Sequence, residues 1–109
     1  MGHDISGYNQ AGEEIAYARF SMGNYNAFIL YSLLDANKFN AGVSGSGESS
    51  NFTVQQMEEA WNNYNQQYNK EDSLTETDIF YWDKNQISEF LLNCLETAKK
   101  EGSVGVYFG

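Results

Sequence analysis

The hydrophobic pattern changes twice along the 109 residues, and these changes limit the folds open to the chain. Stretches with the length and composition of strands lie near both ends, whereas the middle has apolar residues three and four apart, as on one side of a helix. Strands at both ends with helices between them favour an antiparallel sheet with a layer of helices. The sequence therefore predicts an α+β fold, in which a small antiparallel sheet is packed by about three helices on one face. A chain of this length fits a single globular domain spanning residues 1–109.

The sheet is predicted to contain an N-terminal hairpin and a C-terminal strand. Residues 4–8 and 13–20 form the hairpin, since the four residues between them favour a turn. The alternation in the second of these strands leaves open which side meets the core. Residues 103–108 alternate more clearly and should complete the sheet. Their apolar side chains share one face: Val104, Val106 and Phe108.

The first helix is predicted to begin after Asn24, a good N-cap residue. Its apolar residues form a broad stripe at helical spacing, which predicts a largely buried helix: Ala27, Phe28, Leu30, Tyr31, Leu33 and Leu34. Beyond Asp35 this pattern ends. The glycine and serine content of residues 41–50 predicts a flexible loop there.

Two later helices are predicted from start signals that are nearly identical. Thr53 followed by Gln56, and Asp83 followed by Gln86, have the spacing of a capping box, in which the two residues bond each other's backbone amides. Each cap is also flanked by apolar residues that can pack across the first turn: Phe52 with Met57, and Trp82 with Ile87. The second helix should end at Gly102, after two lysines. Residues 77–82, which precede it, fit either a strand or a short helix.

The charge balance excludes several kinds of partner. Fifteen acidic residues against six lysines and arginines give a net charge of −9. Such a chain repels nucleic-acid phosphates and anionic membranes over a Debye length of about 8–10 Å. We therefore expect no direct nucleic-acid ligand and no membrane partner, and a protein with a basic surface as the natural partner. The alternative is that the acidity serves solubility alone.

Residues that usually support catalysis are scarce. The chain has one histidine, His3, one cysteine, Cys94, and one arginine, Arg19. Nucleophilic catalysis needs a base beside the nucleophile, phosphate sites need Arg or Lys, and zinc sites need several Cys or His ligands. His3 lies near an end of the chain that we expect to be mobile, and Cys94 lies on the apolar side of a predicted helix. The sequence therefore predicts no catalytic residue, no cofactor and no metal site.

The expected cellular setting is the cytoplasm. The chain lacks an apolar run long enough to cross a membrane, and its first 21 residues lack the basic and apolar regions of a secretory signal. One cysteine also leaves no internal disulfide to form.

Two segments could bind ions, and for both another interpretation is favoured. Gly42, Gly45 and Gly47 precede a predicted helix, where backbone amides can bind an anion, but their spacing differs from the known phosphate-binding motifs. A mobile linker is the favoured interpretation of this loop. The acidic residues between 71 and 83 lack the glycine of an EF-hand loop, which favours a solvated loop.

The most distinctive segment for binding covers residues 61–72. It combines aromatic, amide and acidic side chains, a mixture common at protein interfaces. The candidate binding residues are Trp61, Tyr64, Asn65, Tyr68, Glu71 and Asp72. The alternative, which the spacing of the aromatic residues favours, is that they form a buried helical stripe while the amides face water.

These observations lead to two functional hypotheses. The first is a non-catalytic acidic binding module, inhibitory or adaptor-like, that docks on a basic protein surface. The second is a small-molecule-binding domain, forming a homodimer, with an aromatic pocket beside the glycine and serine loop.

Overall fold

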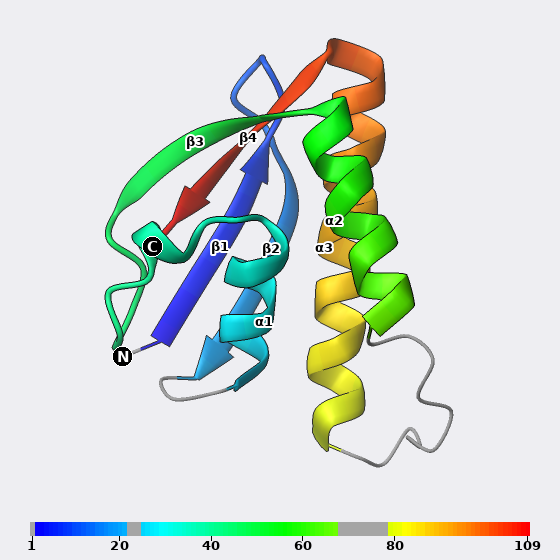
Figure 1. Cartoon of the computed structure of the whole chain (residues 1–109). Coiled ribbons are helices and arrows are strands. Elements are labelled where there is room, and N and C mark those ends of the chain that lie inside the picture. Colours follow the sequence, from blue (N-terminus) through cyan, green and yellow to red (C-terminus); the bar gives the residue numbers. More distant parts are fainter. Residues whose placement is uncertain (1, 22–24, 68–78) are drawn as a thin grey trace.

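Strands from the two ends of the chain lie next to each other in the middle of one antiparallel sheet (Figure 1). The computed structural model describes the backbone of residues 2–21, 25–67 and 79–109, and the side chains of these residues apart from 67 and 79–84. The strands of this described part are β1 (Gly2–Tyr8), β2 (Glu14–Ser21), β3 (Glu48–Thr53) and β4 (Ser103–Phe108), in the order β2-β1-β4-β3. The helices are α1 (Tyr25–Leu33), α2 (Val54–Gln67) and α3 (Ile79–Glu101), with a short 3₁₀ helix η1 (Asn37–Phe39). The predicted α+β fold is confirmed.

The N-terminal hairpin is confirmed, and its turn depends on Asn9. The backbone N–H of Glu13 donates to the Asn9 side chain at 2.9 Å, and the Asn9 amide donates to the Glu13 carboxylate at 3.0 Å. Gly12, with φ of 82°, supplies the left-handed residue that such a turn needs. The structure also settles which side of β2 meets the core, since three alternate residues of β2 are buried: Ala16, Ala18 and Phe20.

The helices lie on the face of the sheet where these side chains point, and one hydrophobic core joins the two layers. Helix α3 approaches the sheet very closely at Gly7. A Cβ atom at that position would lie 2.8 Å from Sγ of Cys94 and 3.2 Å from Cβ of Ala16. Small residues on β1 and β2 therefore allow the long helix to rest directly on the strands. None of the described helices is long and apolar enough to cross a membrane.

Helix α1 buries most of its predicted stripe, but not Phe28. Leu30 and Tyr31 are fully buried, whereas the Phe28 side chain is 50% exposed and Ile29 is buried in its place. Phe28 instead stacks on Tyr25 at the helix surface, with 6.1 Å between ring centroids. The predicted cap Asn24 lies outside the described residues.

Strand β3 contradicts the predicted flexible loop at residues 41–50. Residues 48–53 pair with β4 along its whole length, and the preceding segment is bonded to the end of that strand. Two bonds reach the C-terminal end, from Gly45 N to Gly109 O and from Gly47 N to Phe108 O, and a third joins Ser46 N to Phe39 O of η1, each at 2.8 Å. The loop prediction was wrong for residues 48–50, which belong to an edge strand with polar residues on both sides, whereas residues 41–47 lie in no helix or strand. Only Phe52 is buried, so no alternating apolar pattern marks the strand in the sequence.

The capping box at the start of α2 is confirmed. The Thr53 hydroxyl accepts from the Gln56 N–H at 3.2 Å, and Gln56 Oε1 accepts from the Thr53 N–H at 2.8 Å. Phe52 and Met57, which flank the cap, are both buried. Thr53 is also the last residue of β3, so one residue ends the strand and begins the helix.

The matching prediction at Asp83 was wrong. Helix α3 begins at Ile79, which places Asp83 inside the helix rather than at its N-cap. The expected partner of this cap, Gln86, uses its side chain to bond the backbone of Arg19 on β2. Residues 79–82 are helical, and 77 and 78 lie outside the described residues.

The C-terminal end of α3 and the strand after it match their predictions. Gly102 has a φ of 91°, and its N–H donates to Ala98 O at 2.7 Å. Lys99 and Lys100 lie in the last turn of the helix. The predicted face of β4 is buried: Val104, Val106 and Phe108.

Candidate protein-interaction surface

The structure places three of the candidate binding residues on the C-terminal half of α2. Tyr64 is only 3% exposed and belongs to the core, whereas Trp61 and Asn65 are half-buried. The rings of Trp61 and Tyr64 stack with 6.0 Å between centroids and 24° between planes. Tyr64 therefore supports Trp61 from the core side, and Trp61 is the aromatic residue of this group that reaches the surface. The remaining candidates, Tyr68, Glu71 and Asp72, lie outside the described residues.

Exposed acidic residues occur along the same helix layer. Glu58 and Glu59 are exposed on α2, and Glu89 and Glu96 are exposed on α3, which packs beside α2. Among the described side chains of these two helices, the basic ones are Lys99 and Lys100, at the end of α3. The outward side of α2 and α3, which we call the acidic helix face, exposes Glu58, Glu59, Glu89 and Glu96. The half-buried Trp61 and Asn65 belong to the same helix as the first two of these glutamates.

The opposite face of the sheet carries a different kind of surface. Tyr17 and Tyr107 are 49% and 40% exposed, and the strand register places Ser6 between them and Ser49 beyond Tyr107. Ser6 is only 6% exposed, as expected for a small residue between two large ones. No described helix covers this open face, because the helices lie on the other side of the sheet.

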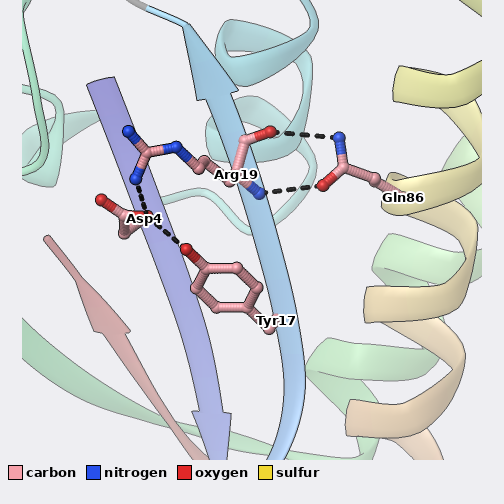
Figure 2. Close-up of polar contacts among 4 residues, drawn as sticks. All are labelled: Asp4, Tyr17, Arg19 and Gln86. Carbon is pink, nitrogen blue, oxygen red and sulfur yellow. Dashed lines mark hydrogen bonds and ion pairs between the residues drawn. The ribbon is translucent and has the colours of Figure 1, made fainter. Parts of the chain in front are cut away.

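One cluster of charged and polar residues lies on this open face (Figure 2). Asp4 and Arg19 are opposite each other on β1 and β2, and their side chains form an ion pair of 2.8 Å. The same carboxylate oxygen accepts a hydrogen bond from the Tyr17 hydroxyl. That bond is the largest cause of a lowered pKa at Asp4 and of a raised pKa at Tyr17. The Arg19 guanidinium also lowers the pKa of Asp4. The cluster is solvent-exposed and its two full charges are paired, so the open face is less acidic than the helix layer.

Gln86 closes the outer edge of β2 beside this cluster. Its side-chain oxygen accepts from the Arg19 N–H at 3.0 Å, and its nitrogen donates to the Arg19 carbonyl at 3.1 Å, as Figure 2 shows. The side chain of a helix residue thus supplies the two bonds that a further strand would make to Arg19. The sequence could not reveal this role, because Gln86 is 67 residues away from its partner.

His3 lies in the core rather than in a mobile end, and that expectation was wrong. It is 3% exposed on β1, with Nδ1 3.0 Å from the Tyr31 hydroxyl and Nε2 3.2 Å from the Gly42 carbonyl. Because a carbonyl only accepts, Nε2 donates to it, and in the neutral ring Nδ1 accepts from Tyr31. Burial raises the pKa of Tyr31 to about 12. His3 therefore joins β1, α1 and the segment before β3.

Cys94 is fully buried on α3, where burial raises the pKa of its thiol to about 12. Reactive cysteines have lowered pKa values and access to solvent, so this environment is that of an inert thiol.

The amides of the glycine segment are used within the protein. The Gly42 N–H donates to the Asn40 side chain at 2.9 Å, and those of Gly45 and Gly47 donate to the C-terminal carbonyls described above. These three amides are thus directed at partners inside the fold. Within the described residues, His, Cys, Asp and Glu side chains form no group of three or more that could hold a metal ion.

Comparisons of the chain with protein-family models, with curated proteins and with solved structures found no match.

Proposed function

We propose that this protein is a non-catalytic acidic binding module, an inhibitor or adaptor that docks on a basic surface of another protein. The observation that carries the proposal is the acidic helix face, where α2 and α3 expose four glutamates and α2 also carries Trp61, which stacks on the buried Tyr64. Tryptophan is enriched among the residues that contribute most to binding at protein interfaces. Stacking on the buried Tyr64 restricts the orientations of the Trp61 ring, and this reduces the conformational entropy lost on docking.

The charge of the whole chain supports the same type of partner. A net charge of −9 creates a field that attracts a basic surface before contact and speeds association. Exposed carboxylates at the rim of an interface contribute to this rate more than to the strength of the final contacts.

The surroundings of His3 and Cys94 support the non-catalytic part of the proposal. Both ring nitrogens of His3 face hydrogen-bond partners inside the fold, and the Cys94 thiol is buried with a raised pKa. The His3 ring and the Cys94 thiol are therefore parts of the buried core.

Selection from a displayed library of folded protein domains with known isoelectric points tests the proposal. The full chain is immobilised and the selection is run at about 0.05 M salt. We expect enrichment of basic domains. Absence of any enriched domain, or enrichment regardless of isoelectric point, would contradict the proposed function. Stabilisation by a metabolite in a thermal-shift screen of the same protein would instead favour the small-molecule hypothesis.

A pair of charge-matched variants then locates the binding surface. Glu58→Gln with Glu59→Gln removes two charges from the acidic helix face, and Glu14→Gln with Asp35→Asn removes two exposed charges elsewhere. Asparagine suits position 35, where φ is 53°. We expect the first pair to slow association with an enriched domain at least fivefold, and the second pair to slow it less than twofold. Equal effects would show that only the net charge matters and that the acidic helix face is not the site.

A further inference from the structure

The hydrogen-bond pattern of the sheet shows which backbone groups of β3 point away from it. Asp4 and Gly109 exchange two bonds, from Asp4 N to Gly109 O at 3.1 Å and from Gly109 N to Asp4 O at 2.8 Å. Gly109, which directly follows β4, thus directs its backbone groups at β1. The backbone groups of successive residues in an antiparallel strand alternate between the two neighbouring strands, so the even-numbered residues of β4 direct their groups at β3. Since Ser50 pairs with Val106, the N–H and C=O groups of Ser49 and Asn51 point outward.

Two further bonds agree with this assignment. The Phe108 carbonyl accepts from the Gly47 N–H on the β3 side, and the Thr53 N–H, which points outward, donates to the Gln56 side chain. The capping box thus satisfies one outward amide of β3. No described segment pairs with Ser49 and Asn51, because β3 is the last strand of the sheet in the part of the chain that is described.

The two edges of the sheet therefore differ. At β2, Gln86 occupies both outward groups of Arg19, and α3 packs along that strand. At β3, the residues with outward backbone groups are exposed, and Figure 1 shows no described segment outside this strand. An edge of this kind can pair with an extended segment of another protein.

We propose that the free edge of β3 accepts an extended segment of a partner protein as a fifth strand, and that this segment carries a lysine or arginine that pairs with Glu48. Glu48 is exposed and is the charged residue of β3. The inference rests on the proposed function, which supplies a basic partner. A second copy of the chain is the disfavoured occupant, because each copy carries a charge of −9 and like charges repel.

The probe for this edge is a phage-displayed library of random linear peptides, selected on the full immobilised chain. We expect enriched peptides to contain Lys or Arg and to lose binding to the variant Asn51→Pro. Proline removes the outward N–H at position 51 and leaves the bonds between β3 and β4 in place, since these use the alternate residues. The matched control is Asn51→Ala, which loses the same side chain and keeps the N–H. The dissociation constant should rise at least tenfold in N51P and less than twofold in N51A.

Two further variants keep the test decisive. If N51P does not fold, as judged by its melting curve and amide NMR spectrum, Ser49→Pro removes the other outward N–H. Glu48→Lys should change the selected peptides from basic to acidic at one position while β3 still pairs. Selection of the same basic peptides by E48K and wild type would overturn the role of Glu48.

The outcomes separate this inference from the proposed function. Basic peptides that bind N51P as tightly as wild type would overturn the edge inference and leave the acidic binding module intact. Peptides without basic residues that still require the Asn51 N–H would overturn the proposed function and the choice of a basic segment. A dimer of the free protein that N51P dissociates would show that the edge takes a second copy, and absence of any selected peptide would also overturn the inference.

Discussion

At the scale of single residues, polar side chains in this protein complete backbone hydrogen bonding where regular structure stops. Gln86 bonds an edge strand, Gln56 bonds the end of β3, and Asn9 bonds the hairpin turn. Each joins groups that would otherwise depend on water, and an unpaired backbone group is costly when buried. These three polar side chains therefore stabilise the fold through the backbone groups that they bond.

The first expected outcome concerns Gln86→Ala, which leaves the Arg19 N–H and C=O without their partner side chain. Hydrogen exchange of the Arg19 amide should accelerate at least tenfold. A partly exposed hydrogen bond contributes about 0.5–1.5 kcal/mol, so unfolding should require about 1 kcal/mol less. Asn85→Ala is the control, because it removes only a long contact of 3.4 Å to Glu89 within α3. Unchanged exchange at Arg19 in Q86A would contradict the role assigned to Gln86.

The second expected outcome concerns Asp4 and pH. Its pKa is lowered in the folded protein, chiefly by the Tyr17 hydrogen bond, from a model-peptide value of 3.8. A lowered pKa gives stability that is present above the unfolded-state pKa and is lost as the pH falls through the folded-state pKa. Asp4→Asn should therefore lose less stability than wild type between about pH 5 and pH 2. The effect should be small, because the pair is exposed to solvent. Parallel urea titrations of both proteins measure it, and identical pH profiles would contradict it.

At the scale of elements, the junction between β3 and α2 depends on Thr53. Thr53→Ala removes the hydroxyl that accepts from the Gln56 N–H, and loss of such a cap costs about 0.5–2 kcal/mol. Thr53→Ser keeps the hydroxyl and should retain most of the stability. Chemical denaturation of the three proteins tests this, and an alanine variant as stable as wild type would contradict the cap.

Local sequence signals predicted one helix start correctly and missed the other. Thr53 and Asp83 have the same capping signature, yet Thr53 is an N-cap and Asp83 is not, because α3 already begins at Ile79. Strand β3 could not be predicted from its own residues, since four polar residues precede Phe52 and pairing with β4 makes the strand.

For the candidate site too, some features could be predicted from the local sequence and others depend on contacts between distant segments. Aromatic spacing on α2 favoured a buried stripe over a binding site, and the structure shows Tyr64 in the core and Trp61 half-buried beside it. The free edge of β3 had no sequence signal at all. Which amides point outward follows from the order of strands and their hydrogen-bond pattern, and both depend on contacts between distant segments.

At the scale of the whole molecule, the sheet separates two chemically different surfaces. The side with helices exposes glutamates of α2 and α3 and carries the half-buried Trp61, and the other side is open and presents Tyr17, Tyr107 and the paired Asp4 and Arg19. The free edge of β3 lies where these sides meet. A partner could therefore be attracted by the acidic helix face and held at the edge of the sheet.

The most direct test of the acidic binding module is the salt dependence of its association with the most enriched basic domain from the selection. Between about 0.05 M and 0.5 M salt, screening should slow association of the wild-type protein at least tenfold and change dissociation less than threefold. This is the result expected if exposed acidic residues guide the encounter. An association rate that does not change with salt, or tight binding to bare duplex DNA at physiological salt, would contradict it.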